Sequence, residues 1–355
     1  MRDAGGRALR FVMIALACYG AAWLGRRIPA FEGVPLIALP TGVALAALWR
    51  CGFSWWPGAF VGALAAALTQ GQPLPVAVSL AVAGTAGPIA AVALGGRYGY
   101  QGGNSRRDLV VLALAGAIGA CLSAALGVGT LVAAGHVAWA DAGARSVAWW
   151  LADIGGIALA TPFLLALSTL DGQDLRRRWL EATLLVLATV AVAATVAGVA
   201  PGTARLALPV SFLAVPPLAW AALRFGVPGA SLATLVVAAY TLTGTARGQG
   251  PFVLADPMLG LAMLWAYLFC LAVLGLLATL LRSELTGAEA KLTQNLEALR
   301  TSQRLYEELV GSLPVGVYRA RAFPSGAIVY EYASPLFCAM LDLTPEPLPS
   351  MHRLG

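Results

Sequence analysis

One acidic side chain, Asp153, lies well inside an apolar segment of the sequence, in the run Trp149-Trp150-Leu151-Ala152-Asp153-Ile154-Gly155-Gly156. An ionisable group in the interior of a membrane is costly, so it faces protein or a cavity and by default marks a functional site. The alternative is a structural hydrogen bond to a neighbouring helix. We favour a binding role for Asp153, with Gly155 and Gly156 allowing another helix or a ligand to approach closely.

Two further pairs of side chains extend this candidate site. Trp149 and Trp150 precede Asp153 on the same segment. Tryptophan gathers at membrane interfaces, and that interpretation stands beside a role in stacking on a ligand. Arg50 and Arg224 either anchor inner loops or contact a substrate. The candidate binding residues are therefore Asp153, Trp149, Trp150, Gly155, Gly156, Arg50 and Arg224.

The sequence offers no machinery for catalysis. It contains two histidines, His136 and His352, and five cysteines that stand singly, so no metal site is predicted. It has no phosphate-binding P-loop, no glycine-rich dinucleotide motif and no nucleophile motif. We expect no cofactor, no metal and no catalytic residue, and we do not expect the chain itself to be an enzyme.

The elements that carry these residues are membrane helices. Residues 51–96 form a run of 46 residues without Asp, Glu, Lys or Arg, and a bilayer core needs about 20 apolar residues per crossing. Over residues 8–282 we predict an all-α polytopic membrane bundle of about 10 transmembrane helices. They lie at 9–25, 33–49, 53–69, 74–95, 108–134, 148–168, 179–200, 206–223, 227–246 and 257–281. The second and third are short, so they are either tilted helices or a re-entrant pair, and a re-entrant pair leaves eight full spans.

The loop arginines predict the orientation. With the N-terminus inside, the inner loops collect twelve arginines and the outer loops five, as the positive-inside rule requires. Both termini are then cytoplasmic, and the net charge of +6 is no sign of nucleic-acid binding. This topology places Asp153 in the outer third of its helix, with Arg145, Arg205 and Arg247 as candidate partners.

A faint internal repeat links two of the predicted inner turns. Arg50-Cys51-Gly52 and Arg224-Phe225-Gly226 each end an apolar segment, and a Pro-Gly-Ala step opens the next one. Glycine allows a tight turn, and proline suits the first turn of a helix. Two interpretations stay open: inner hairpins that converge on such sequences, or a duplicated helical pair with both copies in one orientation.

The pattern changes after residue 282. Every seventh position from Leu285 carries a large apolar side chain, which favours a parallel dimeric coiled coil over a merely solvated amphipathic helix. The predicted seam of this signalling helix (283–311) and its continuation consists of Leu285, Leu292, Leu299, Tyr306 and Leu313. We therefore expect a homodimer joined through the 285–313 helix.

Residues 312–355 change character again. Alternating β-branched and aromatic residues at 314–321 and 327–332 flank the turn Phe323-Pro324-Ser325-Gly326, which predicts a β-hairpin. A helix is expected to begin at Pro335.

At four places the membrane segments resemble the first type in the MASE series of membrane-associated sensor domains. The first motif is Pro40-Thr41-Gly42 with Leu48-Trp49-Arg50-Cys51-Gly52 and Trp56-Pro57-Gly58, and the second is Trp149 to Gly156 followed by Thr161-Pro162. The third and fourth are Ala221-Ala222-Leu223-Arg224-Phe225-Gly226 and Gly248-Gln249-Gly250-Pro251-Phe252. The resemblance covers about residues 8–282.

The last part of the chain is similar to the start of a PAS domain. Residues 312–318 match the beginning of its first strand, and Ser334 stands where the Asn of the common Asn-Pro step would be. The sequence stops before the remaining strands, so we expect an incomplete PAS domain over 312–355.

These resemblances imply an input module of the bacterial inner membrane that senses a small-molecule or membrane-derived cue. Members of the family are joined to histidine kinase or diguanylate cyclase outputs, and no output domain is present here, as in a fragment of a longer protein. The implied partners are the lipid bilayer, a second copy of the chain and the downstream output domain. The alternative function is a secondary transporter that uses the intramembrane acid. The coiled coil and the PAS start argue against it.

Overall fold

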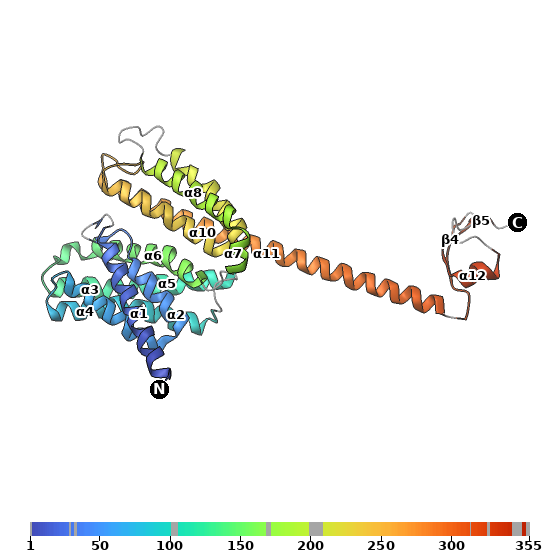
Figure 1. The fold of residues 1–355 in the computed structure, drawn as a ribbon, viewed down its shortest axis with the longest axis horizontal. Coiled ribbons are helices and arrows are strands. Elements are labelled where there is room, and N and C mark those ends of the chain that lie inside the picture. Colours follow the sequence, from blue (N-terminus) through green and yellow to red (C-terminus); the bar gives the residue numbers. More distant parts are fainter. Residues whose placement is uncertain are drawn as a thin grey trace. The chain divides into compact units, whose positions relative to one another are not determined.

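The computed structural model describes residues 2–27, 30–31, 34–100, 106–167, 172–198, 209–312, 314–324, 327–342 and 350–352 (Figure 1). It divides into two compact units, Met1–Ser283 and Glu284–Gly355. The first contains helices and one very short hairpin, and the second contains the rest of a long helix, one short helix and a small sheet.

The first unit is a bundle of helices. They are α1 (Arg2–Gly25), α2 (Leu39–Cys51), α3 (Trp56–Thr69), α4 (Leu74–Arg97), α5 (Arg106–Ala133), α6 (Ala142–Ala166), α7 (Gly172–Arg177), α8 (Trp179–Ala197), α10 (Val215–Ala246) and the first part of α11 (Pro257–Ser312). The strands β1 (Ala30–Phe31) and β2 (Val34–Pro35) pair antiparallel between α1 and α2. Seven helices among the described residues are long and apolar enough to cross a membrane. The predicted all-α polytopic membrane bundle is confirmed.

Each of the ten predicted segments coincides with a helix or part of one. The segments at 33–49 and 53–69 become α2 and α3, which have only 13 and 14 residues. At 1.5 Å per residue these helices are about 20 Å long, so neither crosses a hydrocarbon core of about 30 Å alone. Residues 215–223 of the segment at 206–223 join the segment at 227–246 within α10.

Glycines with positive φ form corners at both Arg-x-Gly turns. Gly52 (φ 100°, ψ 161°) follows α2, and Gly226 (φ 64°, ψ −148°) interrupts α10. Such angles are nearly exclusive to glycine. A Cβ atom at Gly229 would lie 2.8 Å from the carbonyl oxygen of Ala221, although eight residues of straight helix span about 12 Å. The two halves of α10 therefore fold back on each other at Gly226.

Helix α6 occupies the middle of the bundle. It packs against α2, α5 and α10, and in Figure 1 it lies between the group α1–α5 and the adjacent pair of α8 and α10. Close helix contacts depend on glycine: a Cβ atom at Gly87 of α4 would lie 2.7 Å from the carbonyl oxygen of Gly119 on α5. Small residues allow such approach in a bilayer, where helix association depends on packing.

Helix α11 continues from the first unit into the second as one helix of 56 residues. Four residues of the predicted seam, Leu285, Leu292, Leu299 and Tyr306, are 56–65% exposed. The fifth, Leu313, lies outside the described residues. No described part of the chain therefore buries this apolar seam.

The remainder of the second unit is a three-stranded antiparallel sheet with one short helix. Strand β3 (Tyr318–Ala322) pairs with β4 (Ala327–Ala333), and β4 pairs with β5 (Ser350–His352). The predicted hairpin is confirmed, although Ser325 and Gly326 of its turn lie outside the described residues.

The helix expected at Pro335 is α12 (Pro335–Met340), and Ser334 caps it. The Ser334 hydroxyl oxygen accepts hydrogen bonds from the backbone N–H of Phe337 at 3.2 Å and of Val317 at 3.0 Å. Serine therefore fills the capping role in this step, which a short polar side chain can do. The assignment of this unit to the PAS family stays a prediction.

Candidate functional site around Asp153

Asp153 is buried near the middle of α6. It is the twelfth of the 25 residues of the helix, and its exposed fraction is 1%. Helix α6 begins at Ala142, six residues before the predicted segment at 148–168. Asp153 therefore lies near the middle of its helix and not in the outer third that the sequence predicted.

The start of α2 lies against this part of α6. The chain before α2 is not helical, and its residues Leu36 and Ile37 are buried. The backbone N–H of Ala38 donates to the carbonyl oxygen of Ala152 at 2.9 Å. Irregular backbone inside a membrane domain is tolerated only where protein buries it or where it lines a water-filled cavity. This contact places the first turn of α2 directly beside Asp153.

Thr41, in the first turn of α2, is the hydrogen-bond partner of Asp153. Its hydroxyl donates to Oδ1 at 2.5 Å. The first turn of a helix carries a partial positive charge and unpaired N–H groups, which favour a nearby anion. The two residues are 112 positions apart in the chain, so this contact depends entirely on the tertiary fold.

Two glycines allow the approach of α2 to α6. A Cβ atom at Gly156 would overlap the carbonyl oxygen of Ala38, and one at Gly42 would overlap the carbonyl oxygen of Gly156. The hydroxyl of Thr161 donates to the carbonyl oxygen of Gly42 at 3.0 Å. The close approach predicted at Gly156 is present, and the approaching element is α2.

The second oxygen of the Asp153 carboxyl group, Oδ2, is buried and has no hydrogen-bond partner among the described residues. Ser123 of α5 and Trp149 also face the carboxyl group, but neither completes a hydrogen bond to Oδ2. An unsatisfied buried oxygen is costly, and in native proteins it calls for a water, an ion, a proton or a functional role.

Neither of the two predicted arginine partners that the structure describes, Arg145 and Arg247, forms an ion pair with Asp153. Within the described residues Asp153 has no ion-pair partner at all. Arg145 precedes Asp153 by eight residues on α6, which is about 12 Å along the helix axis. Arg247 is the C-terminal cap of α10, and Arg205 lies outside the described residues.

The two tryptophans connect α6 to α5. A Cβ atom at Gly127 of α5 would lie 2.7 Å from the ring of Trp149, and the indole N–H of Trp150 donates to the carbonyl oxygen of Ala117 at 3.0 Å. Trp149 belongs to the Asp153 site, whereas Trp150 makes a separate contact between helices.

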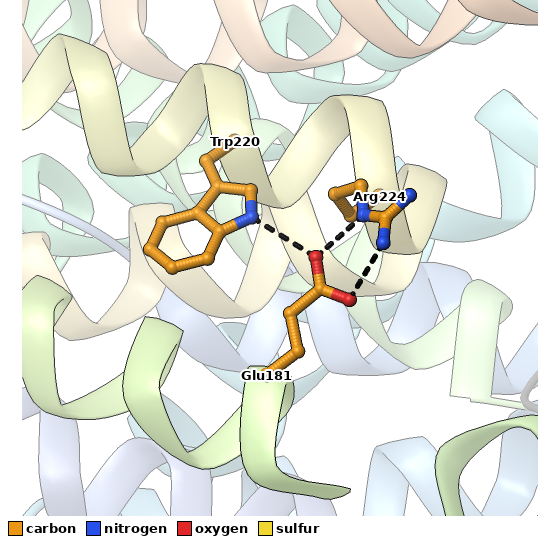
Figure 2. A network of polar contacts seen from close by, with 3 residues as sticks. All are labelled: Glu181, Trp220 and Arg224. Carbon is orange, nitrogen blue, oxygen red and sulfur yellow. Dashed lines mark hydrogen bonds and ion pairs between the residues drawn. The ribbon is translucent and has the colours of Figure 1, made fainter. Parts of the chain in front are cut away.

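Arg224 lies in a different cluster. Figure 2 shows its guanidinium group in a two-point contact with Glu181 of α8, at 2.5 and 2.9 Å, while the indole N–H of Trp220 donates to the same carboxylate at 3.2 Å. Paired N–H donors match a carboxylate well. This cluster joins the start of α8 to the first half of α10, just before the Gly226 corner, and supports the interpretation of Arg224 as an anchor.

Arg50 is exposed in the last turn of α2, nine residues from Thr41 and thus about 13 Å along the axis. Its neighbour Trp49 stacks on Tyr100, with ring centroids 4.2 Å apart. The Tyr100 hydroxyl is buried and has no hydrogen-bond partner in the part of the chain that the structure describes. Burial, with a smaller contribution from Asp108, raises the pKa of Tyr100 to about 12. Because it is exposed and about 13 Å along the axis from Thr41, Arg50 does not contribute to the Asp153 site.

Sequence reasoning missed three residues that matter here. Thr41 stood in a quoted motif without a role. Glu181 is the third residue of α8, too close to the start of its segment to be noticed as an intramembrane acid. The third is Trp265 of α11, whose indole N–H donates to the carbonyl oxygen of Leu151 at 2.9 Å. No local pattern distinguishes it from other membrane tryptophans.

Comparison with known proteins gives one match. The MASE1 family model matches residues 12–285, which include α2, α6, the described part of the Asp153 site and the part of α11 in the first unit. No curated protein and no solved structure matches the chain.

Proposed function

Since the chain belongs to the MASE1 family of membrane sensor domains, which occur in signalling proteins, we propose that it is the input module of a bacterial inner-membrane signal-transduction protein. Its output would be a histidine kinase or a diguanylate cyclase, joined after the 285–313 helix. Both termini would then be cytoplasmic.

The observation that carries this proposal is the Oδ2 oxygen of Asp153, which no described residue pairs with. It lies in the middle of a membrane helix, beside the start of a second helix that Thr41 holds in place. A cue that reaches the site from the outer side or from the membrane would interact with this oxygen. By doing so it would favour one arrangement of α2 against α6 over another, which is how a ligand shifts a population.

Transmission would run through α11. This helix packs in the membrane unit and continues without a break to Ser312. Its exposed seam of Leu285, Leu292, Leu299 and Tyr306 suits a parallel coiled coil with a second copy of the chain. A rotation or register shift of the paired helices would then carry the signal to the output domain.

Cross-linking of the purified chain in proteoliposomes tests the proposal. Cysteine is placed at the seam position Leu292 or at Gln294 on another face, and the disulfide yield at 292 is divided by the yield at 294. Asp153→Asn keeps the shape of the side chain and removes its capacity for charge, so we expect at least a twofold change in this ratio with unchanged membrane insertion.

A matched control separates the site from a general effect of losing an acid. Glu181→Gln makes the same chemical change on α8, where the carboxylate pairs with Arg224, and should leave the ratio unchanged. Equal ratios for the wild type and Asp153→Asn would contradict the proposed role of Asp153. The unsubstituted chain corrects for disulfides formed by the five native cysteines.

One observation favours a secondary transporter as a second candidate. Helix α2 begins inside the bundle with its N-terminus toward an acidic side chain, and transporters bind substrates and ions at such interrupted helices. Proton-coupled or sodium-coupled uptake into proteoliposomes that is abolished by Asp153→Asn would support this function. Absence of uptake for a broad substrate panel, together with the cross-linking change, favours the sensor.

A further inference from the structure

Six consecutive residues of α6, Leu151 to Gly156, receive contacts from two other elements. On one side the carbonyl oxygen of Ala152 accepts the N–H of Ala38, which precedes α2. On the other side the preceding carbonyl oxygen, that of Leu151, accepts the indole N–H of Trp265 at 2.9 Å. Neighbouring carbonyl groups of one helix are therefore bonded to the start of α2 and to α11.

Gly155 is what makes room for the indole. A Cβ atom at this position would lie 3.3 Å from Nε1 of Trp265 and 3.5 Å from the side chain of Ile37. Both residues thus meet α6 at the same glycine. Ile37 also belongs to the same buried apolar cluster as Leu264 and Leu268, the residues on α11 around Trp265.

The position of Trp265 suits a mechanical role. Its ring stacks on Phe269 with ring centroids 5.1 Å apart and planes 7° apart, so its orientation is linked to that of α11. The non-helical chain that ends at Ala38 touches both Gly155 and the Trp265 region, and three residues later Thr41 binds Asp153. A shift of α2 at Asp153 therefore has a direct physical path to α11.

We propose that Trp265 is a positioning residue that couples the Asp153 site to α11, through its hydrogen bond to Leu151 and its packing at Gly155. The signalling consequence rests on the proposed function, whereas the coupling between the two contacts of α6 is a property of the fold. Coupling between sites is reciprocal, so a change at Trp265 must also alter the packing of the start of α2 against α6.

Hydrogen exchange of the full chain in lipid nanodiscs measures that reciprocal effect. Trp265→Phe keeps an aromatic ring and removes the indole donor. We expect amide exchange over 36–42, which includes the Ala38 N–H, to become at least threefold faster, while exchange in α4 and α5 stays at the wild-type rate. If Trp265→Phe only lowered the stability of the whole bundle, amide exchange would become faster in all of its helices.

Trp150→Phe is the matched control, because it removes an equivalent indole-to-carbonyl hydrogen bond of 3.0 Å that joins α6 to α5 and does not involve α11. It should leave exchange over 36–42 unchanged. Gly155→Ala, which displaces the indole without altering it, should reproduce the effect of Trp265→Phe.

Two outcomes would overturn the inference: no change over 36–42 in Trp265→Phe, or an equal change in Trp150→Phe. Neither depends on the cross-linking result. If Asp153→Asn leaves the cross-linking ratio unaltered while Trp265→Phe accelerates exchange over 36–42, the proposed function fails and the coupling stands.

Discussion

Replacing Gly156 by alanine is expected to destabilise the membrane unit strongly, because the added Cβ atom meets backbone and not a flexible side chain. It would overlap the carbonyl oxygen of Ala38 and lie 2.6 Å from its carbonyl carbon. Overpacking of this kind costs roughly 1–3 kcal/mol, and backbone contact puts it at the upper end. The start of α2 must move away from α6 to relieve the overlap.

That movement also separates Thr41 from Asp153. Oδ1 would then lose the hydrogen bond from Thr41, which adds about 1–2 kcal/mol for the newly unsatisfied oxygen. The sum is a loss of about 3–5 kcal/mol, a large share of the ~5–15 kcal/mol that stabilises a typical domain. In thermal unfolding this corresponds to a fall in Tm of about 10 °C.

Thermal unfolding in nanodiscs, followed by tryptophan fluorescence, is the assay. Gly129→Ala is the matched control, because a Cβ atom at Gly129 of α5 has no described atom within 4 Å, and alanine is the better helix former. Its Tm should equal or slightly exceed that of the wild type. A Tm for Gly156→Ala within about 2 °C of the wild type would refute the close α2–α6 crossing and with it the geometry of the Asp153 site.

Two other substitutions test contacts outside that crossing. Tyr100→Phe should not lower Tm near neutral pH, because the hydroxyl it removes is buried and no described residue forms a hydrogen bond with it. The pKa of Tyr100 is raised from 10.0 to about 12, so the wild type loses stability as pH rises from 10 toward 12. Tyr100→Phe has no hydroxyl to ionise and should lose less stability over this range. Identical pH profiles for the two proteins would contradict the buried position of the ring. Arg224→Lys should lower Tm slightly in low salt, because lysine cannot make the two-point contact with Glu181. In high salt Tm should not fall, because the pair is partly exposed, with 50% and 23% of the side chains accessible, and salt screens it. A salt-independent loss would show that the arginine packs into the bundle instead of pairing at its surface.

The general architecture followed from the sequence because the relevant signals are local. Long runs without charge, such as 51–96, mark segments that must avoid water, and each Arg-x-Gly step marks a turn, as the positive φ of Gly52 and Gly226 bears out. The alternation of residues around 318–332 predicted the hairpin for the same reason.

The partners across the bundle did not follow, for an equally physical reason. A helix that is apolar on all sides gives no periodic signal of the face it buries, so α2 and α6 could not be paired in advance. Electrostatics suggested an arginine beside Asp153, but the structure uses the hydroxyl of Thr41, supported by the helix start. The pairing of Glu181 with Arg224 was missed because 43 residues separate them.

The shortness of α2 and α3 has a consequence for how the protein is made. Neither helix, at about 20 Å, is long enough to be released singly from the insertion machinery into a bilayer about 30 Å thick. Each therefore depends on neighbouring helices for its place in the bilayer, and α1 packs on both. Asp153 is synthesised 112 residues after Thr41, so the start of α2 stays incomplete until α6 arrives. The Asp153 site can therefore form only once both helices have been synthesised and α6 has packed against α2.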